Sequence, residues 1–269
     1  MKRLILVASA KGGSGKSYTS RALIDLIRLS GRSVSVWDGD SGTGSVARIY
    51  PDRNPEVGAG VEDVRSPEAP GRWLEAIYTE VDDIIVDVPG GALSSLVRVV
   101  EGGAPTLIAE TQAAGRQIVV ASVIGIKFDS STAPQEAIKL FGSGARHVVV
   151  KNGFWGKPDA FVVYEGMTLE NGSRRFGKTA AAVREVGGEE VYFPPLNSMT
   201  DVLLDVEGMS FAAACEAIAT LGRRHTINSR IWLGSVEEAF AGSWLDTSGA
   251  VPVASNGKAG RGAAVKAGG

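Results

Sequence analysis

Short runs rich in Val and Ile alternate along the chain with segments in which apolar residues recur every three or four positions. The runs predict β-strands at 4–9, 33–37, 83–88, 117–126, 147–151 and 190–193. The helical spacing predicts helices over 17–29 and 132–141, and Ser130 and Ser131 are candidate caps of the second helix. This order predicts an α/β fold, a mostly parallel twisted sheet flanked by helices on both faces.

Other segments are less regular. Residues 104–115 fit a strand or a helix, and the pattern leaves both open. Frequent Pro and Gly between the second and third strands predict a loop-rich connection. Residues 247–269 are rich in Gly, Ala and Ser and carry three basic residues and no acidic one. We therefore expect a single domain over 1–246 and a flexible, disordered C-terminal tail over 247–269.

The last periodic segment, 230–245, places Trp232, Val236, Phe240 and Trp244 on one stripe with a spacing of four residues. Such a stripe on a helix favours packing into the core, and the alternative is a face that binds a partner.

Charge and cysteine content narrow the function classes. The 269 residues have a net charge of −2, which combines a body of −5 with a tail of +3, so no strong basic field covers the protein. A single cysteine, Cys215, excludes an internal disulfide and a multi-cysteine metal site within one chain, and we expect it in the core.

The apolar start is short for a secretory signal and no apolar run is long enough to span a membrane. We expect a cytoplasmic protein without membrane insertion.

A glycine-rich loop follows the first predicted strand directly, with the sequence Lys-Gly-Gly-Ser-Gly-Lys-Ser over 11–17, and a predicted helix begins there. Glycines let the backbone wrap around phosphates, and the N–H groups at a helix N-terminus bind anions. Lys16 is placed to reach the β- and γ-phosphates, and Ser17 to hold Mg²⁺. Position 10 is Ala, so the general G-x-x-x-x-G-K-[ST] pattern is missed at its first glycine.

This variant loop resembles the deviant Walker A signature of the ParA/MinD superfamily of P-loop ATPases. Asp38-Gly39-Asp40 after the second strand is similar to the second aspartate motif of that family, and 87–91, Asp-Val-Pro-Gly-Gly, is similar to its Walker B and switch segment. The resemblance covers residues 1–92 well and weakens toward residue 200. A small ParA-like subgroup, of the plasmid-stability or conjugation-accessory type, fits the short span between Asp40 and Asp87.

The resemblance implies roles for single residues. Asp87 would hold Mg²⁺ with Ser17, and Asp38 would support it. Asp40 would orient the attacking water, which makes it catalytic together with Lys16 and Lys11. Lys11 matches the signature lysine that reaches the phosphates of a second subunit, so the resemblance implies an ATP-dependent homodimer.

The same resemblance implies the rest of the ATP site. Asn152, after the strand at 147–151, would contact adenine, and Pro194 would lie beside the base. As turn formers, both residues also fit ordinary loops. The implied cofactor-binding set is Gly12, Gly13, Ser14, Gly15, Lys16, Ser17, Tyr18, Asn152 and Pro194.

Surface partners are implied less directly. ParA-type proteins bind DNA non-specifically through surface cations, and the candidates here are Arg174, Arg175, Lys178, Arg223 and Arg224, although a solvated surface explains them equally. The lone cysteine argues against relatives that use paired cysteines, including iron–sulfur scaffold ATPases.

The favoured function is a Mg²⁺-dependent ATPase that acts as a dimeric switch in DNA partition or cargo positioning. A ParB-like or cargo-adaptor protein would stimulate it, and nucleoid association would follow from DNA binding. Two alternatives remain, namely an adaptor of a conjugation or secretion apparatus without DNA binding, and an ATP-dependent small-molecule ligase.

Overall fold

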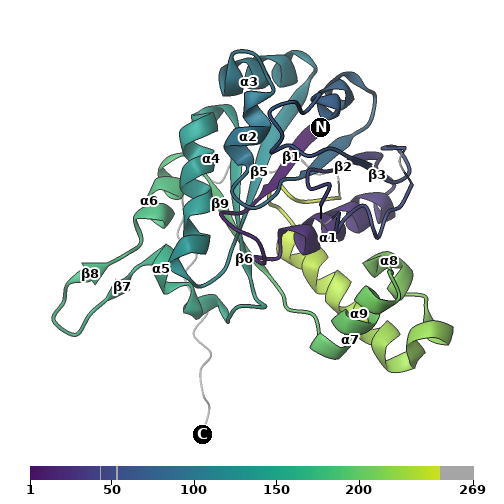
Figure 1. The fold of residues 1–269 in the computed structure, drawn as a ribbon. Coiled ribbons are helices and arrows are strands. Elements are labelled where there is room, and N and C mark those ends of the chain that lie inside the picture. Colours follow the sequence, from purple (N-terminus) through teal and green to yellow (C-terminus); the bar gives the residue numbers. More distant parts are fainter. Residues whose placement is uncertain (43, 53, 249–269) are drawn as a thin grey trace, which may run out of the picture.

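The computed structural model describes residues 1–42, 44–52 and 54–248. Within these residues, seven parallel strands form one sheet in the order β3-β2-β4-β1-β5-β6-β9 (Figure 1). The strands are β1 (Lys2–Ala8), β2 (Val34–Asp38), β3 (Ala59–Val61), β4 (Asp83–Asp87), β5 (Arg116–Ile124), β6 (Arg146–Asn152) and β9 (Glu189–Phe193). The predicted α/β fold with a parallel sheet is therefore confirmed.

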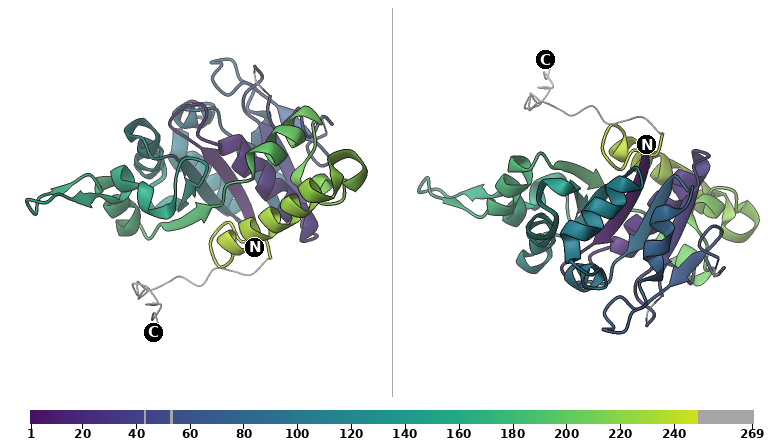
Figure 2. Two further views of the ribbon diagram at one scale, coloured as in Figure 1. Left: turned by 90° about the horizontal axis from the view of Figure 1, so that it is seen from below. Right: turned by 90° about the horizontal axis from the view of Figure 1, so that it is seen from above.

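Helices cover both faces of the sheet, as the views along its edges show (Figure 2). On one face lie α1 (Lys16–Leu29), α7 (Ser198–Val206), α8 (Phe211–Ala214) and α9 (Ile218–Phe240). On the other face lie the 3₁₀ helix η1 (Arg72–Tyr78) and the helices α2 (Leu93–Arg98), α3 (Gly103–Ala113) and α4 (Ala133–Phe141). Two short helices, α5 (Val162–Glu165) and α6 (Lys178–Glu185), pack together near β6.

Alternating residues of each central strand supply the two cores. In β1, Ile5 and Val7 pack toward α1 and α9, whereas Leu4 and Leu6 pack toward η1, α2 and α3. All four are fully buried. A strand covered on both faces reads as a continuous apolar run, which is the pattern that predicted it.

A hairpin of β7 (Met167–Thr168) and β8 (Arg174–Arg175) projects from the body between α5 and α6 (Figure 1). The sequence pattern showed only a Gly/Ser-flanked loop here. Residues 104–115, which the pattern left open, are mostly helix α3. The predicted loop-rich connection between β2 and β4 holds only β3 and η1 as regular elements among its described residues.

The predicted caps of α4 are wrong. Ser130 and Ser131 lie in the 3₁₀ helix η2 (Phe128–Thr132), and their hydroxyls donate to the carbonyls of Lys127 and Phe128, three residues back. Those bonds hold both side chains within η2. Thr132 occupies the cap position, but its hydroxyl likewise donates backward, to the Asp129 carbonyl at 3.1 Å, and does not cap α4.

The C-terminal stripe packs into the core, as the spacing favoured. Trp232, Val236 and Phe240 of α9 are buried against α1 and β9, and Trp244 is buried beyond the end of the helix. Cys215 is half-buried against the same core. Of the predicted tail, residues 249–269 lie outside the described residues. Among the helices that the structure describes, none is long and apolar enough to cross a membrane.

Candidate functional site

The glycine-rich loop lies between the end of β1 and the start of α1. Gly13 and Gly15 have φ values of +76° and +94°, a region that residues with a Cβ rarely adopt, and α1 begins at Lys16 immediately after Gly15. The loop N–H groups thus sit at the N-terminus of a helix of more than three turns, where the helix dipole favours a bound anion. This is the geometry of a phosphate-binding loop.

Strand register brings the carboxylates of two other motifs to this loop. Asp87 aligns with Val7 in β1 and with Asp38 in β2, so both aspartates lie at the carboxyl ends of neighbouring strands. Gly39 N–H donates to the Asp87 carbonyl at 2.9 Å, which joins the two strand ends. In an open parallel sheet, ligands bind outside the carboxyl ends of the strands.

Asp87 is the buried carboxylate that the other polar side chains of the site surround. It is 1% exposed, and its two carboxylate oxygens accept hydrogen bonds from Ser17 Oγ and Ser20 Oγ, each at 2.7 Å. Lys16 Nζ lies 3.5 Å from Asp87 Oδ2. Burial raises the pKa of the Asp87 carboxyl above its usual range, against the opposing effects of Lys16 and the two serines. A cation beside this carboxylate would therefore be stabilised.

The donor set fits Mg²⁺ bound together with a nucleotide. Asp87 and Ser17 supply hard oxygen ligands, and Mg²⁺ in phosphate sites typically takes one or two carboxylates plus phosphate oxygens. Across the described residues, no group of three or more His, Cys, Asp or Glu could hold a metal alone. In addition, Ser14 Oγ in the loop is buried and has no hydrogen-bond partner among the described residues, and an incoming phosphate oxygen would supply one.

Asp38 and Asp40 occupy different environments. Asp38 is fully buried, and its carboxylate accepts from the backbone N–H groups of Asp40, Val46 and Ala47 at 2.9 to 3.1 Å. It therefore orders the loop after β2. Asp40 is partly exposed on that loop, where one carboxylate oxygen accepts from Gly42 N–H and the other lies 3.5 Å from Arg65 Nη1. Asp40 is the more accessible of the two carboxylates.

Lys11 extends along the protein surface. Its Nζ lies 3.1 Å from Asp129 Oδ2 in η2, and the two side chains are 47% and 71% exposed. An exposed pair of this kind contributes only about 0 to 1 kcal/mol, so Lys11 can leave it for another anion. A small cavity of about 110 Å³ adjoins Lys11 and is bounded by the loop and Trp155.

The predicted base site is a cavity of about 180 Å³ on the other side of the loop. Asn152 and Pro194 both line it, and so does Tyr18. Asn152 is 5% exposed, donates from Nδ2 to the Ser14 carbonyl and accepts at Oδ1 from Phe154 N–H. The Tyr18 hydroxyl is buried and has no hydrogen-bond partner within the part of the chain that the structure describes. Burial, followed by the charge of Asp201, raises the pKa of this hydroxyl. The site thus offers polar groups beside an apolar wall.

The switch segment after Asp87 packs directly on the phosphate loop. A Cβ added to Gly90 would lie 2.4 Å from the Lys11 carbonyl carbon and 2.5 Å from Gly12 N. Gly91, with φ +70°, donates its N–H to the Ser9 carbonyl. The predicted switch segment and the phosphate loop are therefore in direct backbone contact.

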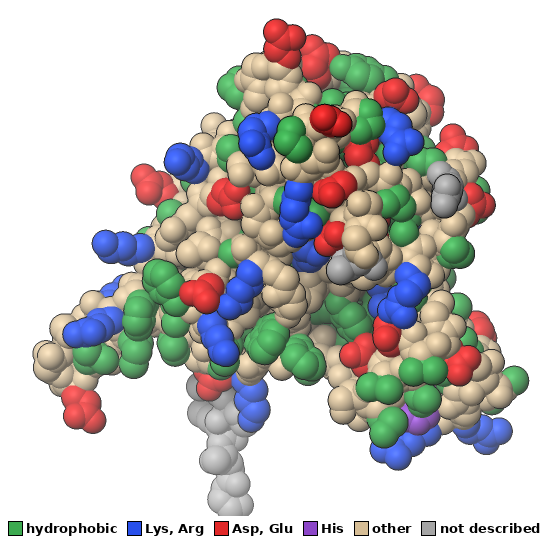
Figure 3. All heavy atoms as spheres, viewed as in Figure 1, with side chains coloured by type: hydrophobic (Ala, Val, Ile, Leu, Met, Phe, Trp, Pro, Cys, Tyr) green, Lys and Arg blue, Asp and Glu red, His purple; other side chains and the backbone are tan. Residues whose placement is uncertain are grey.

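The candidate DNA contacts are exposed but do not form one surface. Arg174 and Arg175 lie on the hairpin and Lys178 at the start of α6, whereas Arg223 and Arg224 lie on α9 just after a kink at Gly222. These two groups lie at opposite ends of the molecule (Figure 1), and the space-filling view shows Lys and Arg side chains at both ends (Figure 3).

Comparison with known proteins gives distant similarities. No protein-family model matches the chain. "Protein MobD" of Acidithiobacillus ferrooxidans is 24% identical over 243 residues, 90% of this chain and 97% of MobD. The cytosolic Fe-S cluster assembly factor cfd1 of Neurospora crassa is 37% identical over 82 residues, 30% of this chain and only 24% of that protein.

Among solved structures, the septum site-determining protein MinD of Pyrococcus horikoshii, complexed with Mg-ADP, has a TM-score of 0.48 and 15% identity, over 85% of this chain and 94% of that one. A ParA family ATPase from Chlorobium tepidum has a TM-score of 0.44 and 16% identity, over 85% of this chain and 98% of that chain. The chain is similar to P-loop ATPases of the ParA/MinD type. Membership of the ParA/MinD superfamily, and of a subgroup within it, stays a prediction.

Some residues of the site escaped the sequence analysis. Ser20 lies one helical turn after Ser17 in α1 and donates a hydrogen bond to Asp87. Its position three residues after Ser17, on the same side of the helix, is the sequence signal that could have identified it. Asp129, the partner of Lys11, lies 118 residues away in the chain, and Asp201 reaches the base cavity from α7. Neither had a local pattern to mark it.

Proposed function

We propose that this chain is a Mg²⁺-dependent ATPase that works as an ATP-dependent dimeric switch. The arrangement of Lys16, Ser17 and Asp87 around a glycine-rich loop carries the proposal. It joins a phosphate-binding helix terminus to a buried carboxylate that a divalent cation would stabilise. The unpartnered hydroxyls of Ser14 and Tyr18 flank that arrangement, one at the phosphates and one at the base.

In this proposal the nucleotide lies across the loop from the cavity beside Asn152 and Pro194 to the carboxyl end of β4. Lys16 contacts the β- and γ-phosphates, and Ser17 and Asp87 hold the Mg²⁺ ion. Asp38 orders the loop after β2 from a buried position, which places Asp40 at the accessible edge of the site. Asp40 then orients the attacking water, and the γ-phosphate leaves as inorganic phosphate.

Lys11 is assigned to the partner subunit's nucleotide. Its side chain is nearly half exposed, and among the described residues it is held only by the surface pair with Asp129, so it is available to a phosphate brought by a second copy. The switch segment at Gly90 touches the backbone of Lys11 and Gly12, which would couple the state of the nucleotide to the dimer surface.

Steady-state phosphate release with and without Mg²⁺ tests the enzyme. We expect turnover with Mg²⁺ and ATP, loss of binding in Lys16→Ala, and retained ATP binding with slower hydrolysis in Asp40→Ala. Arg65→Ala is the matched control for Asp40, because it removes the nearby cation and leaves the carboxylate in place. Unchanged turnover in Asp40→Ala would remove Asp40 from the mechanism.

We further propose that the ATP-bound dimer associates with non-specific DNA in the cytoplasm and is released when a partner protein stimulates hydrolysis. The support is the exposed basic residues at both ends of the molecule, which a dimer presents twice. DNA binding should require ATP and fall steeply with salt, and Arg174→Ala with Arg175→Ala should weaken it for all sequences alike. Absence of binding at low salt would favour an adaptor that works without DNA.

A further inference from the structure

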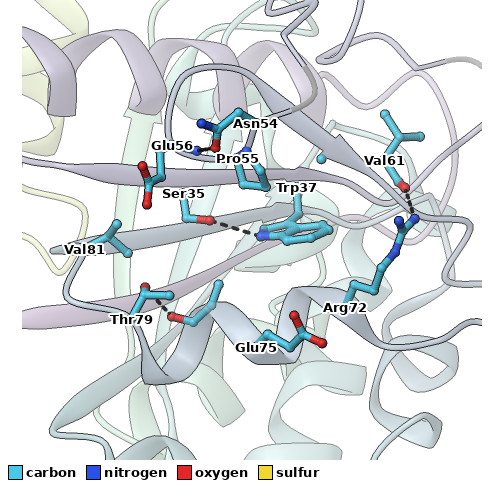
Figure 4. Close-up of a pocket in the computed structure, with 12 residues that line it drawn as sticks. Ser35, Trp37, Asn54, Pro55, Glu56, Val61, Arg72, Glu75, Thr79 and Val81 are labelled. Atoms are coloured by element: carbon cyan, nitrogen blue, oxygen red, sulfur yellow. Dashed lines mark hydrogen bonds between the residues drawn. The ribbon is translucent and has the colours of Figure 1, made fainter.

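A further cavity lies away from the phosphate loop, at the edge of the sheet. It has a volume of about 670 Å³ and is bounded by β2, β3, the 54–56 loop and η1 (Figure 4). None of its lining residues belongs to the site described above. Its volume falls in the range of about 300–1,000 Å³ that is typical of ligand pockets.

The pocket lies where the connection from β2 to β4 is irregular. Elsewhere α-helices cover this face of the sheet, but here the cover is the 3₁₀ helix η1, and β3 spans only Ala59–Val61. The indole of Trp37 therefore forms a wall of the pocket rather than a fully enclosed core group. Gly60 packs on this ring so closely that an added Cβ would lie 2.7 Å from it.

Two carboxylates line the same pocket. Glu56 and Glu75 are exposed, and in the view of Figure 4 Glu56 lies to the upper left of the Trp37 indole and Glu75 lies below it. Neither makes a side-chain hydrogen bond or an ion pair with the rest of the described chain. The guanidinium of Arg72, by contrast, already donates to the Val61 carbonyl and lies 3.9 Å from Glu62.

A buried hydroxyl adds a polar group to the same pocket. Ser35 is 3% exposed, and its Oγ accepts from Trp37 Nε1 at 3.1 Å. The hydroxyl hydrogen of Ser35 has no acceptor among the described residues, and a peptide carbonyl in the pocket would provide one. An aromatic wall, unpaired carboxylates and a hydroxyl donor together suit a peptide that carries an ammonium or guanidinium group.

We propose that this pocket binds the basic C-terminal segment of the same chain, residues 249–269. That segment contains Lys258, Arg261 and Lys266 and no acidic residue, so it complements Glu56 and Glu75 in charge. Its small Gly and Ala residues would let a lysine or arginine side chain reach between the pocket walls.

The end of the described chain lies close enough for this contact. The Asp246 carbonyl accepts from Arg3 Nη1 at 2.6 Å, and Arg3 Nε lies 2.6 Å from Asp83 Oδ1. Asp83 begins β4 two residues after Val81, which lines the pocket. The ten residues from 249 to Lys258 can span up to about 35 Å when extended, so chain length does not limit the contact.

Distances between spin labels in the full-length chain test this proposal. One label is placed at Ala259→Cys and the other at Tyr78→Cys, an exposed position beside the pocket, in a Cys215→Ser background. Double electron–electron resonance should show a short-distance population for this pair. A pair with Met199→Cys on α7 should lack it. Raising the salt concentration should reduce the population, because the attraction is between charges.

Charge variants decide the outcome. Glu56→Gln with Glu75→Gln should remove the short-distance population, and so should Lys258→Ala with Arg261→Ala and Lys266→Ala. The matched control, Glu237→Gln with Glu238→Gln, removes the same charge from exposed sites on α9 and should leave the population intact. An unchanged distribution in the pocket variant, or an equal loss in the control, would overturn the proposal.

Two further outcomes are informative. If dilution of labelled chains into unlabelled protein removes the short distance, the occupant is the segment of a second copy, which overturns the assignment within one chain. If the pocket variant fails to fold by circular dichroism, the tail variant alone decides, because none of its substitutions lies in the described body.

Discussion

The side-chain amide of Asn152 holds the phosphate loop in place. Its Nδ2 donates to the Ser14 carbonyl at 2.8 Å, although the two residues are 138 positions apart in the chain. A Cβ on Gly15 would lie 2.1 Å from the same nitrogen, so the contact also requires a glycine at that position. Asn152 thus links the end of β6 to the loop between β1 and α1, and it also lines the base cavity.

We predict that Asn152→Ala weakens binding of ATP and GTP alike. Loss of the bond to Ser14 loosens the loop that binds the phosphates, which both nucleotides share. The expected cost is about 1 kcal/mol, which corresponds to about a fivefold loss of affinity. Equilibrium binding of fluorescent ATP and GTP analogues measures it, with Asn171→Ala on the hairpin as the matched control. A loss confined to ATP would instead show that Asn152 acts mainly by contacting adenine.

Asp129→Asn should favour the dimer. The substitution removes the intramolecular partner of Lys11 and frees the lysine for a phosphate on a second copy. Because the pair is exposed, the expected effect is less than 1 kcal/mol, a few-fold lower dimer dissociation constant with ATP. Sedimentation velocity over a concentration series measures it, and Asp205→Asn, also exposed, is the control. A weaker dimer in Asp129→Asn would mean that Asp129 is itself part of the interface.

Gly90→Ala should abolish nucleotide binding. The new methyl group would overlap the backbone of Lys11 and Gly12 and displace the phosphate loop, at a stability cost of about 1–3 kcal/mol. Gly234→Ala on α9 is the control, because a Cβ there meets nothing within 4 Å and should stabilise the helix by about 0.5–1 kcal/mol. Isothermal titration with Mg-ATP and thermal melting report both effects. Retained affinity in Gly90→Ala would show that the loop tolerates this displacement.

Without nucleotide, Asp87 should make the stability of the protein depend on pH. Burial raises its pKa in the folded state above the value of about 3.9 for an unfolded chain. Between those two values the folded state binds more protons than the unfolded state, so this contribution to stability falls as the pH rises from about 4 upward. In Asp87→Asn it is absent.

Urea unfolding of the native chain and of Asp87→Asn at several pH values from 4.5 to 8 measures this difference. The stability of the native chain relative to the variant should fall with increasing pH, and Mg-ATP should stabilise the native chain only. An exposed carboxylate serves as the control, with Asp205→Asn expected to show little pH dependence. A difference that does not change with pH would place the ionisation of Asp87 near its ordinary value.

The sequence predicted every described strand of the sheet except the three-residue β3, because the central strands are covered on both faces. In β1, for example, Ile5 and Val7 face one core and Leu4 and Leu6 face the other, so the strand is apolar at every position. A continuous apolar run of this kind is typical of a strand that is buried on both faces. The phosphate loop was equally local, since its glycines and Lys16 lie within seven residues. Helix α3 was ambiguous because its apolar residues do not form a clear stripe at helical spacing.

Contacts between distant segments could not be predicted. The bond from Asn152 to Ser14 and the pair of Lys11 with Asp129 depend on how β6 and η2 are placed around the loop, which no local pattern encodes. The caps of α4 were misassigned because Ser130 and Ser131 bond backward within η2. Hydroxyl side chains near a helix start have both options, and packing decides between them.

The molar mass of the protein in solution, measured by light scattering with and without Mg-ATP, tests the central proposal most directly. We predict a monomer without nucleotide, a dimer with Mg-ATP that persists longest in Asp40→Ala, and a monomer under both conditions in Lys11→Ala. Lys127→Ala, a neighbouring lysine at the same cavity, should behave as the native chain. A dimer that forms equally without ATP, or one that Lys11→Ala leaves intact, would contradict the switch.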